Sequence, residues 1–245
     1  MDRDDYLAAL RRDADGFGDA CAVGDLAAPV PSCPEWSLAD LLWHLTEVFD
    51  FWGSVAAGPL LDPAGHTDPT RPPDGELMST FRSGVTGLLA TLTQIDPATP
   101  VWTWSTDKTA GFIIRRMAQE TAMHRWDAEA AAGRSSTIEP ELATDAIDEF
   151  LFLFAGYPYA EGKGPQPIGG SVHLHCTDVP GEWFVVDGAH GSMVTTRQHT
   201  KGDCAIRGPA ADLLLALWRR VPLSTVEVIG DAELAARFIA HTAAD

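Results

Sequence analysis

One stretch in the middle of the chain carries the clearest arrangement of residues for chemistry. Glu120, His124 and Asp127 are spaced by four and then three positions, so a helix places them in a single stripe. The same stripe begins with the apolar Ile113 and Met117, which indicates that it faces a core. Carboxylates are seldom buried unless they are paired or bound to a metal, and side chains four apart on a helix can reach one point. The spacing therefore indicates a metal-binding pair, with an ordinary surface ion pair as the alternative.

A third ligand would complete such a site, and His44 is the best candidate. It lies at the edge of the apolar face of an earlier predicted helix, about 100° from the centre of that face, where it can point towards a neighbouring helix. Two imidazoles and one carboxylate with an open position suit catalytic zinc or non-haem iron. Ligand type alone does not select among Zn²⁺, Fe²⁺, Ni²⁺ and Mn²⁺. The zinc-peptidase motif H-E-x-x-H is absent from the sequence.

Amphipathic helices must position these side chains. Ser37 and Asp40 form a Ser-x-x-Asp capping arrangement at the start of the helix that carries His44, and Gly133 is suited to follow the end of the helix that carries His124. Apolar residues recur at helical spacing over residues 4–21, 37–52, 77–95, 109–132 and 140–154.

The pattern changes after a segment rich in Gly and Pro, residues 156–170. Beyond this linker, the periodicity predicts short strands over residues 171–177, 182–186, 192–197 and 225–229, and helices over 209–221 and 231–241. We therefore predict a two-domain α+β protein. A helical bundle occupies residues 1–155, and a small α+β domain occupies residues 156–245.

Composition and charge exclude several classes of function. The 245 residues include 35 acidic and 17 basic side chains, and the formal charge of −18 disfavours nucleic acids and anionic membrane surfaces as partners. No apolar run approaches the roughly 20 residues that span a bilayer, and the N-terminus lacks the layout of a signal peptide. The four cysteines are far apart and form no Cys-x-x-Cys pair, so we expect reduced thiols and a cytoplasmic protein.

Two segments resemble a known family. The segment SCPEWSLADLLWHL, residues 32–45, and the segment ETAMHRWD, residues 120–127, are similar to the two ligand-bearing segments of the mycothiol-dependent maleylpyruvate isomerase family. Weaker likeness continues through GPAADLL, residues 208–214, and Gly-Asp at 230–231. The resemblance covers nearly the whole chain. It implies a DinB-like metal-binding four-helix bundle followed by a small C-terminal domain of sterol-carrier-like type.

The resemblance also implies a reaction. His44, Glu120 and His124 would be zinc ligands, and the thiol cofactor mycothiol would bind the open metal position through its sulfur. Zinc lowers the pKa of a coordinated thiol, so that a thiolate exists at neutral pH. In the isomerase, this thiolate would add to the cis double bond of maleylpyruvate, and rotation followed by elimination would give the trans isomer. Other relatives would use the same activated thiol for transfer, so we expect a small-molecule isomerase or S-transferase.

Four further residues have candidate roles. Asp127 is a candidate hydrogen-bond acceptor that orients a metal ligand, with a surface acid as the alternative. The family places an arginine in the C-terminal domain for the anionic substrate or for mycothiol. The adjacent Arg219 and Arg220, at the end of a predicted helix, are the first candidates, and Arg207 is the next. A helix-end charge or a solvated face is the alternative for each.

Two other functions are compatible with the same residues. A metal-dependent hydrolase would use bound water in place of a thiol, and a non-catalytic binding or regulatory protein could retain the fold. Elsewhere, His173 and His175 alternate along a predicted strand, and we interpret them as the polar face of that strand rather than a metal site. Cys33 is interpreted as a small packed residue. The oligomeric state and the true substrate are left open.

Overall fold

The structure is a computed structural model that describes residues 1–245 apart from 59, 156–166, 190–191 and 242–245. The chain divides into two compact units, Met1–Ile138 and Glu139–Asp245. The first unit is helical and the second contains a five-stranded sheet, which confirms the predicted α+β class. Most of the predicted linker lies outside the described residues. Within the described part of the chain, no helix combines the length and apolar character needed to cross a bilayer.

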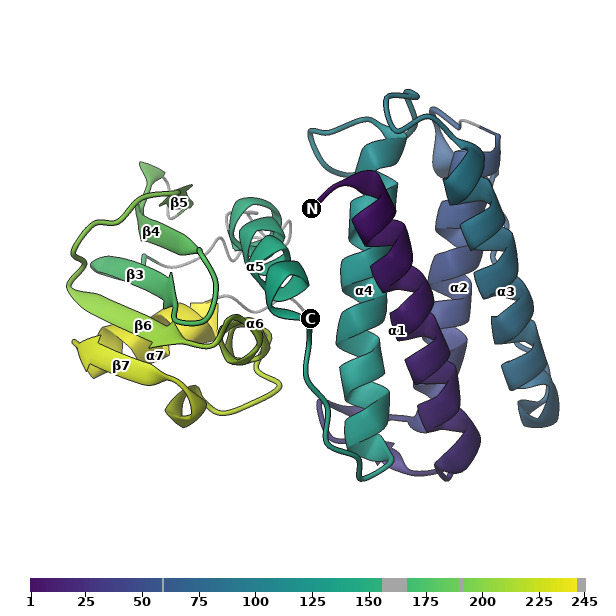
Figure 1. The fold of residues 1–245 in the computed structure, drawn as a ribbon, viewed down its shortest axis with the longest axis horizontal. Helices are drawn as coiled ribbons and strands as arrows, with labels where there is room; N and C mark the ends of the chain where they lie inside the picture. Colours follow the sequence, from purple (N-terminus) through teal and green to yellow (C-terminus); the bar gives the residue numbers. More distant parts are fainter. Residues whose placement is uncertain (59, 156–166, 190–191, 242–245) are drawn as a thin grey trace. The chain divides into compact units, whose positions relative to one another are not determined.

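Four long helices form the first unit, as predicted. They are α1 (Arg3–Val23), α2 (Leu38–Ala57), α3 (Asp74–Gln94) and α4 (Ala110–Ala131). Helix α1 packs against α3 and α4, and α2 packs against the same two helices, so α1 and α2 occupy opposite corners of the bundle. Figure 1 shows the four helices side by side. This arrangement places α2 and α4, which carry the candidate ligands, next to each other.

Aromatic side chains fill the centre of the bundle. Phe81 of α3 lies between Phe17 of α1 and Phe49 of α2, with ring centroids 5.0 Å and 5.8 Å away. All three rings are buried. Interdigitated aromatic rings contribute both area burial and specific ring contacts, so this cluster fixes how three of the helices pack.

Helix α2 begins where the capping pattern predicts. The Ser37 hydroxyl accepts a hydrogen bond from the Asp40 backbone N–H at 3.2 Å, and the Asp40 carboxylate accepts one from the Ser37 N–H at 2.9 Å. This reciprocal pair satisfies two N–H groups that the first turn of a helix leaves without a partner. A short two-stranded ribbon, β1 (Pro29–Val30) and β2 (Cys33–Ser37), leads into it; neither strand is predicted by the sequence pattern.

The connection from α3 to α4 is mostly irregular, as is that from α2 to α3. A 3₁₀ turn, η1 (Pro63–Gly65), lies between α2 and α3, and an isolated bridge joins Pro100 to Thr109 before α4. Helix α4 is followed by Gly133, whose φ of 69° is the left-handed conformation expected there.

The second unit begins before the predicted domain boundary. Helix α5 (Pro140–Glu149) continues as a π-helical turn, η2 (Phe150–Phe154), so the predicted fifth helix is present. The predicted boundary between residues 155 and 156 falls after this helix, whereas the first unit ends at Ile138. The physical reason is packing, because α5 buries its apolar face against α6 (Ala210–Leu217) within the second unit.

A mixed sheet forms the centre of the second unit. Its strands are β3 (Ser171–Cys176), β4 (Glu182–Asp187), β5 (Met193–Thr196), β6 (Cys204–Gly208) and β7 (Glu227–Gly230), in the spatial order β5-β4-β3-β6-β7. Strands β3 and β6 are parallel, and the other neighbours are antiparallel. Strand β6 is not predicted by the sequence pattern. A 3₁₀ turn, η4 (Leu223–Thr225), precedes β7, and α7 (Ala232–His241) packs against β3, β6 and β7.

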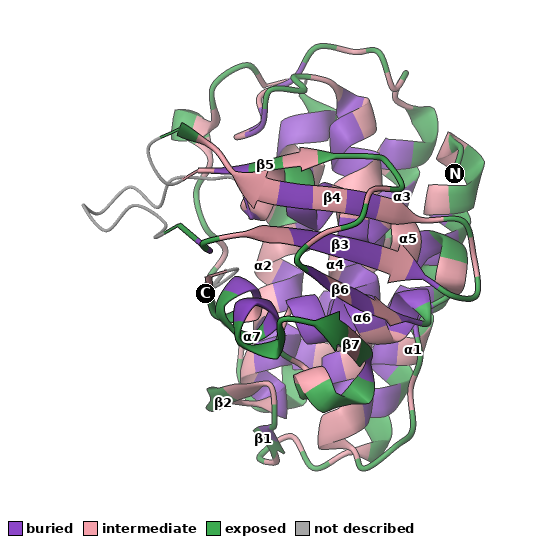
Figure 2. Cartoon of the chain, turned by 90° about the vertical axis from the view of Figure 1, so that its left-hand side faces the viewer, coloured by how far each residue is buried: buried purple, intermediate pink, exposed green. Residues whose placement is uncertain are grey.

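The two faces of this sheet differ. Val172, Leu174 and Cys176 of β3 are buried on the face that α5 covers, where the Trp183 indole donates a hydrogen bond to Asp148 of α5. Because side chains alternate along a strand, the intervening residues of β3 lie on the opposite face. Figure 2 displays the mixture of buried and half-buried positions along these strands.

Helix α6 is shorter than predicted. The predicted helix extends to residue 221, but the observed one ends at Leu217. Arg219 has a φ of 58°, and the N–H groups of Arg219 and Arg220 donate to the carbonyls of Ala216 and Leu215. These two bonds form a Schellman closure, which ends the helix and reverses the chain.

Candidate metal centre

Helix α4 places the predicted stripe at the centre of the bundle. Ile113 and Met117 are fully buried, and Glu120, His124 and Asp127 follow on the same side. The side chain of Asp127 has no exposed surface, and those of Glu120 and His124 are 14 % and 9 % exposed. The alternative of an exposed ion pair is therefore wrong for this stripe, because its polar residues lie inside the unit.

Helix α2 brings His44 to the same point. His44 Nε2 and His124 Nε2 lie 3.6 Å and 3.3 Å from Glu120 Oε1. One ligand atom from each of the three residues lies within 4.8 Å of the other two. A single carboxylate oxygen thus faces two imidazole nitrogens that come from different helices. Two nitrogens and one oxygen gathered in this way could hold a divalent transition-metal ion.

Arg116 holds the other oxygen of Glu120. Its guanidinium donates to Glu120 Oε2 from one turn earlier on α4. Burial would raise the pKa of the Glu120 carboxyl, but the positive charges of Arg116 and His124 outweigh it and hold the pKa well below its ordinary value. Glu120 is therefore a carboxylate, with one oxygen directed to the arginine and one to the histidines.

Asp127 orients His124. His124 Nδ1 lies 3.0 Å from Asp127 Oδ2, and the Ser32 hydroxyl donates to Asp127 Oδ1 at 2.5 Å. Burial would lower the pKa of His124, but the negative charges of Glu120 and Asp127, with their hydrogen bonds, raise it to about 9. In the absence of a metal, the positive charge on His124 thus lies between two buried carboxylates.

One side of the cluster is partly open. The His44 side chain is 32 % exposed, in contrast to His124. The two imidazoles meet edge to face with centroids 5.1 Å apart, and the Trp36 ring lies 4.8 Å from His44. Trp36 belongs to the ribbon that precedes α2, so the same capping turn positions both Trp36 and His44.

The three candidate arginines all lie in the second unit. Arg219 and Arg220 lie in the turn after α6 and not within the predicted helix over residues 209–221, and Arg220 donates to the Trp218 carbonyl at 3.1 Å. Arg207 lies on β6, with its Nε 3.3 Å from a carboxylate oxygen of Glu227 on β7. The geometry of the His44 cluster involves the first unit alone, so the binding roles of these arginines stay predictions.

Sequence reasoning does not find Arg116, Ser32 or Trp36 as contacts of the site. The signal for Arg116 is present, because it precedes Glu120 by four residues and faces it on a helix. Ser32 and Trp36 lie inside the segment that carries the family resemblance, but their contacts arise from the ribbon that the sequence pattern does not predict.

Most of the cysteine side chains are buried. Cys21, Cys176 and Cys204 are buried, and Cys33 is half-buried. Burial raises the pKa of Cys21 to about 12, and the pKa values of Cys176 and Cys204 to about 11. These three thiols are protonated at neutral pH and poor nucleophiles.

The fold and the cluster define a class: a two-domain protein in which a four-helix bundle presents a His-Glu-His set, followed by a small α+β domain. Residues 7–129 match the family described as mycothiol maleylpyruvate isomerase N-terminal domain, and residues 141–237 match its C-terminal domain. The chain belongs to the mycothiol maleylpyruvate isomerase family.

Individual relatives are distant. Two uncharacterized proteins of Mycobacterium tuberculosis, from strains CDC 1551 / Oshkosh and ATCC 25618 / H37Rv, are 26 % identical over 169 residues, which cover 65 % of this chain and 88 % of each relative. The crystal structure of the mycothiol-dependent maleylpyruvate isomerase has a TM-score of 0.58 at 12 % identity and covers 88 % of both chains. A point mutant of the mycothiol-dependent maleylpyruvate isomerase gives a TM-score of 0.57 at the same identity and coverage. These structures show the shared fold.

Proposed function

We propose that the protein is a mycothiol-dependent enzyme whose His44, Glu120 and His124 hold a zinc ion, and that it isomerises a maleylpyruvate-like substrate or transfers the thiol. The observation that carries the proposal is the convergence of two imidazole nitrogens on one carboxylate oxygen at 3.3 Å and 3.6 Å. Ligand atoms around a tetrahedral zinc lie about 3.3 Å apart, because each sits about 2.0–2.1 Å from the metal. The donor set and its spacing therefore fit zinc.

The residues around the ligands fit this role. When bound, zinc would lower the pKa of the mycothiol thiol and supply a thiolate as nucleophile. Asp127 holds His124 through Nδ1, which leaves Nε2 directed at the cluster. Arg116 fixes the Glu120 carboxylate so that Oε1 faces the histidines. The exposed side of His44 leaves access for a small molecule.

An anionic substrate also needs a positive group. We propose that Arg220 or Arg219, and next Arg207, binds the carboxylate of the substrate or a polar group of mycothiol. Support comes from the family membership and from the position of the Arg219–Arg220 pair in a strained turn after α6. The four cysteines are far apart in the sequence and form no Cys-x-x-Cys pair, which fits a reducing compartment, so we place the enzyme in the cytoplasm with small molecules as its partners.

The test is an assay of maleylpyruvate isomerisation by the purified full chain with added mycothiol. We expect turnover that requires the thiol and that falls by at least about 100-fold in Glu120→Gln, since the variant loses a ligand and its charge. Glu76→Gln is the matched control, because Glu76 is an exposed carboxylate in the first turn of α3. Glu76→Gln should retain wild-type activity.

Three results would contradict the proposal. The first is undiminished activity of Glu120→Gln, which would remove the metal site from the reaction. The second is ester hydrolysis without any thiol, which would favour a metal-dependent hydrolase. The third is binding of metal and mycothiol without turnover of any electrophilic substrate, which would favour a non-catalytic binding protein.

A further inference from the structure

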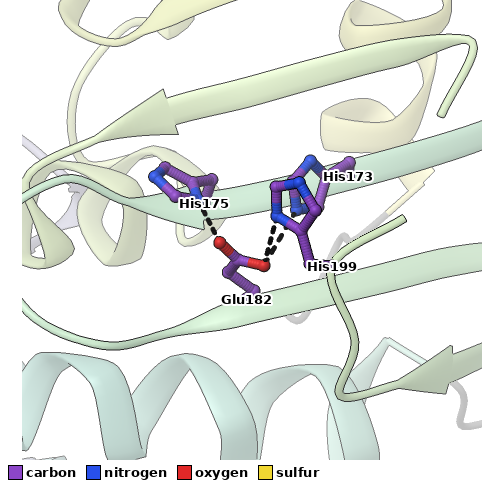
Figure 3. A group of neighbouring side chains, drawn as sticks. All are labelled: His173, His175, Glu182 and His199. Atoms are coloured by element: carbon purple, nitrogen blue, oxygen red, sulfur yellow. Dashed lines mark hydrogen bonds and ion pairs between the residues drawn. The ribbon is translucent and has the colours of Figure 1, made fainter. Parts of the chain in front are cut away.

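A second group of potential metal ligands lies in the C-terminal unit. His173 and His175 come from β3, Glu182 comes from β4, and His199 comes from the segment between β5 and β6. These residues include three of the chain's eight histidines. Figure 3 shows the three imidazoles gathered around the one carboxylate. The group lies within a single unit and shares no residue with the His44 cluster.

Strand register and chain topology bring the four residues together. His175 is directly opposite Glu182 in the antiparallel pair of β3 and β4, and His173 lies two residues earlier on the same face of β3. Strands β5 and β6 are separated in the sheet by β4 and β3. The short connection between them, residues 197–203, therefore crosses that face, as Figure 2 shows. His199 lies on this connection, and Figure 3 shows its imidazole beside the other three side chains.

The distances are those of a compact ligand cluster. His175 Nδ1 lies 2.6 Å from Glu182 Oε1, and His199 Nδ1 lies 2.7 Å from Glu182 Oε2. His173 Nε2 lies 3.8 Å from the same Oε2. One ligand atom from each residue lies within 4.8 Å of all the others. Small side-chain rotations convert these separations to the roughly 3.3 Å between ligands of a tetrahedral zinc.

His173 is the one residue of this group whose ring nitrogen at Nε2 is buried and not satisfied by a hydrogen bond among the described residues. His173 is only 7 % exposed, and its Nε2 atom is buried without a hydrogen-bond partner among the described residues. His175 and His199 each have a hydrogen bond to Glu182, so a purely structural polar network accounts for those two and leaves His173 unsatisfied. A buried imidazole nitrogen without a partner is costly, and a metal ion at this point would satisfy it.

We propose that His173, His175, Glu182 and His199 form a second metal site, which binds a divalent transition-metal ion of the zinc type. Three imidazoles and one carboxylate offer the nitrogen and oxygen donors that zinc accepts, and the carboxylate offsets part of the ion's charge. His199 is 77 % exposed, so an ion can enter from solvent. The bound ion ties the crossing segment, residues 197–203, to the sheet and stabilises the second unit by mass action.

The experiment is a zinc titration of the metal-stripped full chain in competition with a chromophoric chelator, followed by elemental analysis. The decisive variant is His199→Ala, because an exposed side chain on a connecting segment can be removed without opening the core. We expect wild type to bind about one more zinc ion per chain than His199→Ala under the same chelator, with an affinity loss of at least about 10–100-fold in the variant. Zinc should also raise the thermal midpoint of the wild type more than that of His199→Ala.

Three further variants control for charge and for the other cluster. Glu182→Gln should lose the same zinc ion, whereas Glu233→Gln, an exposed carboxylate in the first turn of α7, should retain it. Glu120→Gln should leave this ion in place, so failure of the proposed enzyme site does not affect the result. Equal zinc content and equal affinity in wild type, His199→Ala and Glu182→Gln would overturn the proposal.

Discussion

His124 Nδ1 lies 3.0 Å from the carboxylate of Asp127, which is three residues further along α4 and fully buried. Asp127 also receives a hydrogen bond from Ser32, outside the helix. A ligating histidine whose second nitrogen is held by a carboxylate has a fixed ring orientation and a more basic ligand nitrogen. The relationship therefore makes Asp127 a positioning residue for the proposed metal site.

Asp127→Asn should weaken zinc binding at the His44 cluster by about 10–100-fold, because the neutral amide no longer favours the His124 orientation. Ser32→Ala, which removes only the hydrogen bond that Asp127 accepts, should have a smaller effect. Chelator competition with the full chain measures both. Equal zinc affinity in Asp127→Asn and wild type would show that Asp127 does not support the ligand.

Two helical glycines should respond with opposite sign to alanine. A Cβ at Gly16 of α1 would meet Arg125 Cδ of α4 at 2.8 Å, and Arg125 pairs with the buried Asp13 at 3.0 Å. Gly16→Ala should therefore lower the free energy of unfolding by about 1–2 kcal/mol. A Cβ at Gly87 of α3 meets nothing within 4 Å, so Gly87→Ala should raise it by about 0.5–1 kcal/mol. Urea unfolding compares them, and a shared sign would contradict this description of the α1–α4 contact.

The charge of Asp40, in the first turn of α2, should make the stability of the protein fall at acid pH. Hydrogen bonds from Ser37 and Arg71, with the arginine's charge, lower the pKa of Asp40 from 3.8 to about 2. A carboxyl whose pKa is lower in the folded state stabilises the protein above its unfolded pKa, and this contribution is lost as the pH falls towards the folded value. Asp40→Asn should thus cost about 0.5–1 kcal/mol at neutral pH.

The matching measurement is thermal unfolding of wild type and Asp40→Asn from neutral pH down to about pH 2. The difference between their midpoints should be constant at neutral pH and shrink as the pH falls through the window from 3.8 to about 2. A difference that stays the same across this window would show that the charge of Asp40 does not contribute.

Phe81 should be a sensitive aromatic position in the core of the bundle. Its ring contacts Phe17 and Phe49, so truncation opens a cavity among three helices. Phe81→Ala should reduce the free energy of unfolding by about 3–5 kcal/mol. Phe152→Ala is the exposed comparison; it loses a surface contact with Arg197 and should cost about 1 kcal/mol. Similar losses in denaturant titrations would contradict the assignment of Phe81 to the core.

The bundle was predictable because its signals are local. Periodicity places the four helices, and the Ser37–Asp40 pair marks the first turn before His44. The stripe on α4 depends on helical spacing alone, so it predicts the common face of Glu120, His124 and Asp127. The helical pattern could not predict the contacts that Ser32 and Trp36 make with Asp127 and His44. The ribbon that positions Ser32 and Trp36 has only two short strands with a register shift.

The second unit was harder to predict because its contacts are non-local. Strand β6 is short and includes the charged Arg207, which lies beside His175 in the sheet. Its place depends on parallel pairing with β3, which no local pattern encodes. The alternation of His173 and His175 correctly placed them on one strand face. Their meeting with Glu182 and His199 depends on strand register and on the crossing segment, so the sequence reading of a simple polar face missed it.

The measurement that tests the central claim most directly is the zinc content of purified wild type and His124→Ala under identical loading and chelator conditions. The His44–Glu120–His124 site predicts that the variant holds about one zinc ion fewer per chain than the wild type, and that mycothiol no longer binds to it. Equal zinc content and equal mycothiol binding in the two proteins would contradict the account.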